Sequence, residues 1–387
     1  MAEISNGHVP MKLDGALSSY LDFLRFFAAL AVLLAHMEQD GLYLSWLPMT
    51  YFSHEAVIVF FVMSGLIIYS TTASAHRQPT NYIIARVSRV YSVALPAILF
   101  SVLAASLVPT DILINNGQLS NYRPFAWWDM ISSALFLNES WMNSASLTMN
   151  APYWSLCYEV WYYLLFGAYF FVSGKLRWVL LAAFACIAGP AILVLFPIWI
   201  AGAWVASGQR FGSLAWSKNL ALVIFFASIA VIVAINFSGV DIALRVWLHD
   251  HVPGFWRLKS AQRLFTDYLV GAAIVANILA FSRLDSRIQS FFLVRKKVFS
   301  YLAGFSFTLY LFHRPMSQLI AYYFPNSEQS IPYSIACAMA ILLVCLAISY
   351  GTERQLKRWR QMISLFFFAA ECPENVVPAA SLPVLEQ

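Results

Sequence analysis

The run YLDFLRFFAALAVLLAHM, residues 20–37, carries two basic side chains inside a predominantly apolar segment. Arg25 lies near its beginning and His36 near its end. Eleven residues, close to three turns of an α-helix, separate them, so both project from nearly the same helix face about 16 Å apart. Ionisable groups inside a membrane span are costly and normally face the bundle interior or a water-filled cavity. The run therefore predicts a transmembrane helix with a functional face.

Two simpler interpretations of this run exist. Arg25 can snorkel to lipid headgroups beside Asp22, with His36 at the opposite interface, but this does not explain why the two side chains share a face. The other interpretation is a secretory signal peptide. Such a peptide would begin with more positive charge and end in small residues at a cleavage site, whereas acidic residues precede this run and Glu38 follows it.

The composition is that of a membrane protein. Hydrophobic residues make up 60% and charged residues 11% of the 387 residues, and the mean hydropathy is +0.68. An ordinary soluble domain carries about 25% charged residues. Apolar stretches of about 20 residues, the length needed to cross a bilayer, recur along the whole chain and leave no room for a large soluble domain. The 5 cysteines have neither the spacing of a metal site nor that of a disulfide framework.

We predict an all-α bundle of about ten transmembrane helices. The expected spans are residues 20–37, 55–71, 91–108, 156–173, 177–190, 192–207, 219–236, 264–281, 300–321 and 332–350. Gly189-Pro190 and Pro197 interrupt the run that contains the fifth and sixth spans, which could also form one long kinked helix. Two crossings are favoured because they keep the basic residues that flank this run on one side of the membrane.

Most Lys and Arg residues fall on one side of this arrangement. Of the 24 in the chain, five belong to loops of the opposite side and two, Arg25 and Arg314, lie within spans. The positive-inside rule then assigns both termini to the cytoplasm. The chain divides into a cytoplasmic segment 1–19, a transmembrane domain 20–355 and a cytoplasmic tail 356–387 that we expect to be disordered or interfacial. The net charge of +5 follows from this asymmetry and indicates no nucleic-acid partner.

The two long loops predicted on the outer side differ in composition. Residues 109–153 combine flat aromatic side chains with neutral hydrogen-bonding ones, namely Asn115, Asn116, Asn121, Trp127, Trp128, Asn138, Trp141 and Asn143. Such a surface suits a sugar, although an aromatic belt at the membrane interface explains the tryptophans equally well. Residues 237–263 contain His249 and His251 without a third ligand, which is weak evidence for a metal, and we predict no metal site.

Polar residues within or next to the spans form two groups. On the cytoplasmic side, Arg25, Arg86 and Arg89 could hold phosphate groups through forked, charge-assisted hydrogen bonds. Contact with lipid headgroups is the alternative for the last two. On the outer side, a neutral histidine could take a proton from a hydroxyl group, with carboxylates to orient it. The members of this outer group are His36, Glu55, Glu159 and His313.

Five short motifs occur in a characteristic order. They are Leu21-Asp22-x-Leu24-Arg25 with His36 after ten more residues, FFVMSGLI at 60–67, Arg86-x-x-Arg89, Trp154-Ser155-Leu156 with Glu159, and Ser306 through His313-x-Pro315. Together they resemble the membrane-bound acyltransferase family 3, whose members O-acylate bacterial surface polysaccharides, lipopolysaccharide O-antigens and lipo-oligosaccharides. The resemblance extends over about residues 20–355. The chain departs from the family at Phe26 and Leu66, where glycine and phenylalanine are usual, and neither position has a proposed polar role.

The resemblance implies an acyl-CoA donor, commonly acetyl-CoA, that arrives from the cytoplasm as a co-substrate, with no permanently bound cofactor. It implies a saccharide acceptor, such as exopolysaccharide or lipopolysaccharide, and a multi-pass location in the bacterial inner membrane. Carried onto this sequence, Arg25 and His36 would be the catalytic pair, and Arg86 with Arg89 would engage the donor. We place Glu159 with the catalytic pair, and we expect further substrate contacts from Ser64, Glu55, Trp154, Tyr310 and His313.

The residues leave two mechanisms and two other functions open. His36 could act as general base on the acceptor hydroxyl, or it could be acylated itself and relay the group outward. The alternative function is a secondary transporter with Arg25 and His36 as an intramembrane substrate or proton site. The two halves with corresponding broken helices that such a transporter would show are missing from the sequence. A non-catalytic scaffold is the third interpretation, and it predicts that His36→Ala changes no product.

Overall fold

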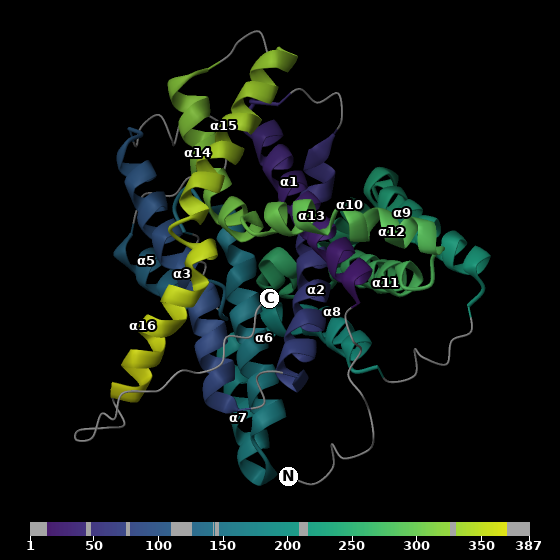
Figure 1. Ribbon diagram of the computed structural model, residues 1–387. Helices are drawn as coiled ribbons and strands as arrows, with labels where there is room; N and C mark the ends of the chain where they lie inside the picture. The colour runs from purple at the N-terminus through teal and green to yellow at the C-terminus, as the bar shows by residue number, and fades with distance from the viewer. Residues whose placement is uncertain are drawn as a thin grey trace.

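The computed structural model describes residues 14–43, 48–74, 78–109, 126–141, 143, 147–208, 216–325 and 330–369. Within these ranges the chain forms helices and no β-strand, which confirms the predicted all-α class (Figure 1). The expectations for residues 1–13 and 370–387, and for Asn115, Asn116 and Asn121, lie outside the described residues.

Each predicted span overlaps one long helix. These helices are α1 (Gly15–Gln39), α2 (Ser53–Ser74), α3 (Pro79–Ser106), α6 (Trp154–Phe171), α7 (Gly174–Ala188), α8 (Pro190–Ala206), α9 (Lys218–Ser238), α11 (Leu264–Phe281), α14 (Ser306–Tyr323) and α15 (Ile331–Ser349). Helix α3 begins well before the predicted residue 91, and the ninth span also includes the end of a second helix. Among the described residues, 6 segments are long and apolar enough to cross a membrane, and α8 is a shorter apolar helix. The count of ten crossings and the cytoplasmic position of the termini therefore stay predictions.

Shorter helices lie in the segments predicted as loops and tail. They are α5 (Trp127–Ala134), α10 (Val240–His251), α12 (Ser286–Val294), α13 (Lys296–Ala303) and α16 (Leu356–Ala369), with 3₁₀ turns η1 (Met49–Phe52), η3 (Ala151–Tyr153), η4 (Phe255–Ala261) and η5 (Glu353–Gln355). The first part of the tail, expected to be disordered or interfacial, is thus the helix α16, which packs against α3. The ninth span starts later than predicted, because residues 296–303 form α13, which packs against α1.

Local sequence explains where the helices begin and end. The carboxylate of Asp14 accepts a hydrogen bond of 2.6 Å from the N–H of Leu17 and caps α1. Gly41 follows this helix with φ +72°, a conformation that glycine adopts without strain. Gly189, with φ +84°, separates α7 from α8, and Pro190 begins the second helix. The run between residues 177 and 207 therefore forms two helices instead of one, and the two crossings that the charge pattern favours stay a prediction.

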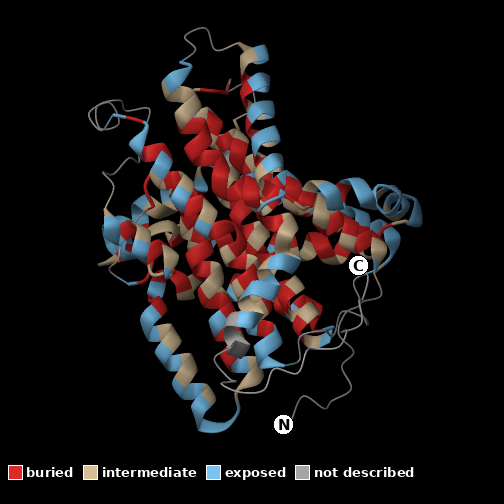
Figure 2. Cartoon of the chain, turned by 60° about the vertical axis from the view of Figure 1, so that its left-hand side comes forward, coloured by how far each residue is buried: buried red, intermediate tan, exposed pale blue. Residues whose placement is uncertain are grey.

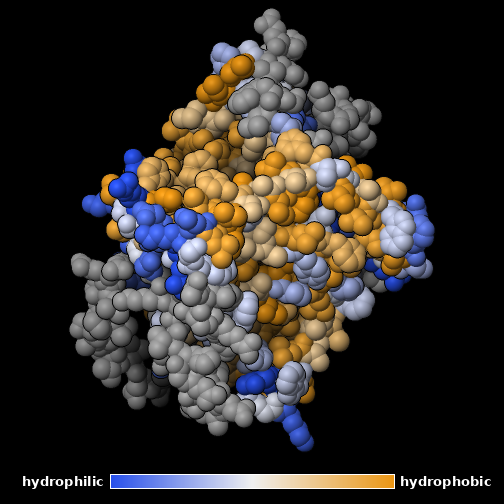
Figure 3. Space-filling view, turned by 90° about the vertical axis from the view of Figure 1, so that its right-hand side faces the viewer, coloured by the Kyte–Doolittle hydropathy of each residue, from blue (hydrophilic) through white to orange (hydrophobic). Residues whose placement is uncertain are grey.

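Helix α1 packs against α2, α13 and α14. Buried residues gather where the helices cross, and exposed residues lie toward the margins of the molecule (Figure 2). Apolar side chains cover most of the face in Figure 3, and hydrophilic residues gather mainly toward its edges. Because a water-soluble protein rarely exposes so large an apolar surface, this surface and the membrane-length helices indicate a multi-pass membrane protein.

Candidate active site

A cavity of about 120 Å³ lies between α1, α2, α3, α6 and α14. By volume it has room for on the order of ten water molecules, which suits a small polar group or one part of a larger ligand. It brings together six of the ten predicted site residues from five helices. They are Arg25, Ser64, Arg86, Arg89, Glu159 and Tyr310.

Arg89 is the arginine of this cavity that has an acidic partner. A side-chain nitrogen of Arg89 lies 2.9 Å from Oε1 of Glu353, which belongs to η5. The other oxygen of Glu353 accepts hydrogen bonds of 3.1 Å from the backbone N–H groups of Phe307 and Thr308. Glu353 therefore caps α14 and fixes Arg89 beside it. We did not predict this residue as part of the site, because its sequence signal is a single acid in the basic segment after the last span.

Arg86 and Arg25 have no acidic partner of this kind. Arg86 lies over the rings of Tyr82 and Tyr163, 5.8 Å from each centroid, and its buried Nε has no hydrogen-bond partner. In the part of the chain that the structure describes, no carboxylate is in ion-pair contact with either Arg86 or Arg25. The cavity therefore has a surplus of positive charge, and this favours an anionic ligand.

Glu159 is the acid on the cavity wall. The hydroxyl of Ser64 donates to its Oε1 at 2.7 Å, and the hydroxyl of Tyr163 donates to the same oxygen. The indole N–H of Trp199 in turn donates to Ser64 at 3.1 Å. These contacts orient the carboxylate from α2, α6 and α8, so Ser64 positions Glu159 as well as lining the cavity.

Tyr310 borders both the cavity and a second cluster. Its hydroxyl donates to the carbonyl of Pro152 at 3.0 Å and accepts from Ser155 at 2.7 Å. Its ring centroid lies 6.1 Å from that of His313, one turn further along α14. The Tyr310 side chain therefore connects the cavity with the region of the two histidines.

His36 belongs to this second cluster and does not line the cavity. Its Nδ1 lies 2.9 Å from Nε2 of His313. The guanidinium of Arg314 donates to the carbonyl of His36 at 3.1 Å and to Oδ2 of Asp40 at 3.0 Å, and Ser317 donates to the same carboxylate oxygen at 2.5 Å. Burial raises the pKa of Asp40, which follows the last residue of α1, to about 6, although Arg314 and Ser317 oppose the shift. The end of α1 is thus held by α14.

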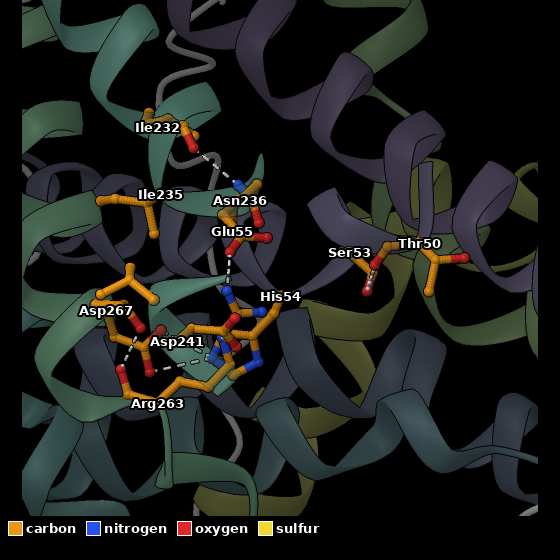
Figure 4. A network of polar contacts seen from close by, with 12 residues as sticks. Thr50, Ser53, His54, Glu55, Ile232, Ile235, Asn236, Asp241, Arg263 and Asp267 are labelled. Carbon is orange, nitrogen blue, oxygen red and sulfur yellow. Dashed lines mark hydrogen bonds and ion pairs between the residues drawn. The ribbon is translucent and has the colours of Figure 1, made fainter. Parts of the chain in front are cut away.

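Glu55 and Trp154 belong to a third cluster. Oε1 of Glu55 pairs with Arg263 at 2.5 Å, as Figure 4 shows. His54 pairs with Asp267 at 3.0 Å, and the indole of Trp154 stacks on His54 with 5.8 Å between ring centroids. The side chains of Glu55 and Arg263 are 5% and 16% exposed, so the pair is largely buried. This cluster joins α2 to the start of α11.

One expectation about His36 is wrong. We expected Glu55 and Glu159 to orient its imidazole, but Glu55 pairs with Arg263, and Glu159 bonds to hydroxyl groups on the cavity wall. A second imidazole, that of His313, takes the position expected for a carboxylate. The reason lies in packing: α14 faces the end of α1, whereas the arginine next to Glu55 comes from the distant segment before α11. Within the described residues, no group of three or more His, Cys, Asp or Glu side chains could hold a metal ion.

The acyltransferase domain of one protein family matches residues 18–350, which is most of the chain and includes every predicted site residue. The chain belongs to acyltransferase family 3. No curated protein and no solved structure matches it. Glu353 of this acyltransferase lies just beyond the matched range, although its partner Arg89 lies within it. The family membership favours a membrane acyltransferase over the transporter and the scaffold.

Proposed function

We propose that the acyltransferase moves an acyl group, acetyl in the expected case, from acyl-CoA on the cytoplasmic side to a hydroxyl group of a surface or lipid-linked saccharide. The observation that carries this proposal is the surplus of guanidinium groups at the cavity. Coenzyme A bears a diphosphate and a further phosphate, and arginine binds phosphate oxygens through forked, charge-assisted hydrogen bonds. The cavity is too small for the whole coenzyme, so the proposal places one part of it here.

The proposed reaction exchanges a thioester for an ester. The hydroxyl oxygen attacks the carbonyl carbon, the carbon–sulfur bond breaks, and the hydroxyl proton must end on the departing thiolate. His36 either carries this proton as a general base, a role worth about 10²–10⁴-fold in rate, or accepts the acyl group and passes it on. Glu159 is proposed to accept a hydrogen bond from the donor, because its carboxylate is oriented at the cavity wall.

The proposed saccharide contact lies in the segment between α3 and α6. Trp127, Trp128 and Trp141 are 69%, 55% and 55% exposed, and the indole N–H of Trp128 donates to Asn143 at 3.2 Å. Exposed indole faces next to amide groups suit a sugar ring, and they also suit the interface of a membrane. Replacement of Trp127 and Trp128 by alanine should lower glycan acylation without changing acyl-CoA binding. Unchanged acylation would assign both to the membrane interface.

The donor role is tested by binding. In protein purified into lipid nanodiscs, Arg86→Gln combined with Arg89→Gln should weaken acetyl-CoA binding, measured by calorimetry, by about tenfold or more. A hydrogen bond to a charged group contributes about 1.5–3 kcal/mol, and 1.4 kcal/mol corresponds to tenfold in affinity. Arg257→Gln is the matched control, because Arg257 is exposed and does not line the cavity. Equal binding by the double variant and the control would remove the donor assignment.

The transfer itself is tested on the cell surface. Mass spectrometry of the surface glycan should show one acyl group per repeat fewer when the gene is deleted. Wild-type protein should restore the mass, and His36→Ala at equal membrane abundance should not. Unchanged glycan mass together with altered solute uptake would favour the transporter instead.

A further inference from the structure

The two histidines form a chain of hydrogen bonds whose direction is determined by the backbone. Nδ1 of His313 lies 3.0 Å from the carbonyl oxygen of Leu309. A carbonyl can only accept a hydrogen bond, so Nδ1 of His313 carries the proton. A neutral imidazole has one N–H, and Nε2 of His313 is therefore a bare acceptor.

His36 must then be the donor in the contact between the two rings. Its Nδ1 lies 2.9 Å from Nε2 of His313 and also 3.0 Å from the carbonyl oxygen of Val32. Both neighbours accept, so both require a proton on Nδ1 of His36. The lone pair of His36 therefore resides on Nε2. The opposite tautomer would direct the lone pair of Nδ1 at two other lone pairs.

We propose that His313 is a positioning residue that holds His36 in its Nδ1–H tautomer and so reserves Nε2 for the transfer step. This inference rests on the proposed function. It replaces the expected substrate contact by His313, because both ring nitrogens of this residue are used within the protein. His313 is fully buried, whereas His36 is partly exposed, which is the arrangement that a supporting group and a reacting group need.

The neighbouring residue fixes the backbone that carries His36. Arg314 donates to the carbonyl of His36 at 3.1 Å and to Asp40 at 3.0 Å. Two consecutive residues of α14 therefore act on the same turn of α1: Arg314 holds its main chain and His313 holds its ring. His313 therefore positions the imidazole, whereas Arg314 holds the two helices together.

The proton balance of the transfer is consistent with this arrangement. When the acceptor hydroxyl attacks the thioester, its proton moves to Nε2 of His36, and the Nδ1–H remains donated to His313. The carbon–sulfur bond then breaks, and Nε2 returns the proton to the thiolate of coenzyme A. If the acyl group first bonds to Nε2, the same tautomer provides the attacking lone pair, the carbon–sulfur bond breaks, and coenzyme A leaves as the thiolate. Attack by the acceptor hydroxyl then breaks the carbon–Nε2 bond, and the hydroxyl proton passes to that thiolate. Either route needs Nε2 free of a proton at the start.

The tautomer can be measured without any activity. Nitrogen NMR of protein with labelled histidine ring nitrogens, in nanodiscs, distinguishes bare from protonated nitrogens, and His36→Gln assigns the signals among the 7 histidines. We expect His36 to show a protonated Nδ1 and a bare Nε2. His313→Leu should produce a mixture of both tautomers. A protonated Nε2 in the wild type would overturn the inference even if acyl transfer were demonstrated.

Kinetics separates positioning from a purely structural role. In His313→Leu, kcat should fall about 100-fold while KM for acyl-CoA stays within about twofold, because the donor cavity is unchanged. His313→Gln offers an amide oxygen as acceptor and should recover at least tenfold of that loss. His249→Gln, an exposed site on α10, is the control. Equal losses of kcat in the Leu and Gln variants would overturn the inference. If His313→Leu fails to fold, the nitrogen NMR spectrum of the wild type decides, because it reports the tautomer of His36 directly. A wild type that transfers nothing would refute the proposed function alone.

Discussion

Arg314 and Asp40 form an ion pair that is shielded from water on all sides. Their side chains are 1% and 0% exposed, and the pair measures 3.0 Å between nitrogen and oxygen. Such a pair contributes little to stability when complete, but removal of one partner typically costs about 3–5 kcal/mol. Arg314 also donates to the carbonyl of His36, so the pair is coupled to the backbone that carries this imidazole.

We predict that Asp40 makes the stability depend on pH. Burial raises its pKa from 3.8 to about 6, so the folded protein holds this proton more tightly than the unfolded chain does. The contribution of Asp40 to the free energy of unfolding must then fall as pH rises from about 4 to about 6, by at most roughly 3 kcal/mol, and stay constant above that range. The variant Asp40→Asn has no proton to lose at this position. All other carboxyl groups are the same in both proteins, so the difference in stability between wild type and variant at each pH reports Asp40 alone.

The measurement is the melting temperature of both proteins in detergent between pH 4 and pH 8. The melting temperature of the wild type relative to the variant should fall between about pH 4 and 6 and change little above pH 7. A difference that stays the same over this whole range would show that Asp40 titrates at its ordinary pKa.

Two glycines allow α2 and α8 to cross at close range. A Cβ on Gly65 would lie 1.9 Å from the carbonyl oxygen of Trp199, and one on Gly202 would lie 1.9 Å from that of Val62. Small residues permit this kind of close helix approach in membranes. The crossing also brings the indole of Trp199 to Ser64, which holds Glu159. The carboxylate on the cavity wall therefore depends on a helix crossing.

Gly65→Ala should force these helices apart. Overpacking costs about 1–3 kcal/mol or more, so we expect the melting temperature to fall by several degrees. Donor binding should weaken too, because Ser64 would move away from Trp199. Gly351→Ala is the matched control, since its Cβ would meet one backbone oxygen, that of Ile348, at 3.6 Å. If Gly65→Ala melts at the same temperature as the wild type, the two helices can move apart without loss of stability.

Helix α14 contains a proline next to the residues that hold α1. Pro315 has no N–H, so the carbonyl of Leu311, four residues earlier, lacks its usual helical partner. The side chain of Asn150 donates to this carbonyl at 2.8 Å and thereby replaces the missing bond. The turn that carries His313 is thus stabilised from the segment that precedes α6.

A double-mutant cycle tests this compensation. Asn150→Leu should cost about 1–3 kcal/mol, because it leaves a buried carbonyl without a partner. In a Pro315→Ala background the backbone N–H returns, and the cost of Asn150→Leu should be smaller by at least about 0.5 kcal/mol. Thermal melts of the four proteins provide the comparison. Strictly additive effects would mean that Asn150 does not compensate for the proline.

The molecule as a whole has its apolar groups outside and several of its charges inside. Leu99, Phe226 and Leu343 are 65%, 61% and 59% exposed, whereas His313 and Arg314 are buried. Water-soluble proteins show the opposite arrangement, with apolar groups buried and charged groups exposed. The arrangement seen here is expected for helices that are surrounded by lipid and enclose a polar site.

The orientation of this assembly is a further prediction. The positive-inside rule places Lys297 in the cytoplasm and Asp250 outside, and both are exposed. In a background without native cysteines, a membrane-impermeant maleimide should label Asp250→Cys in right-side-out vesicles. It should label Lys297→Cys after the vesicles are made permeable. The opposite labelling pattern would reverse the predicted topology and, with it, the side from which the proposed donor is expected to arrive.

Helix positions were largely predictable from local sequence, and side-chain partners were not. Apolar runs of membrane length predicted ten segments, and each of them contains a helix. Gly189-Pro190 predicted an interruption, and α7 and α8 are separated there. The site was predictable as a set of residue types: Arg25, Arg86 and Arg89 do line one cavity. The start of α14 was not predicted, because residues 296–303 continue the helical pattern and the break depends on packing of α13 against α1.

The amino-acid sequence by itself determined that this chain is an all-helical membrane protein and which polar residues interrupt its apolar helices, since both follow from composition and periodicity. The order of its motifs carried the resemblance to acyltransferase family 3. The tertiary structure alone decided the partners of these polar residues: Arg89 pairs with Glu353, and His36 bonds to His313 instead of a carboxylate. The physical reason is that periodicity shows which side of a helix turns inward but not which other helix lies opposite. A buried charge or imidazole bonds to whatever group the packing brings within about 3 Å.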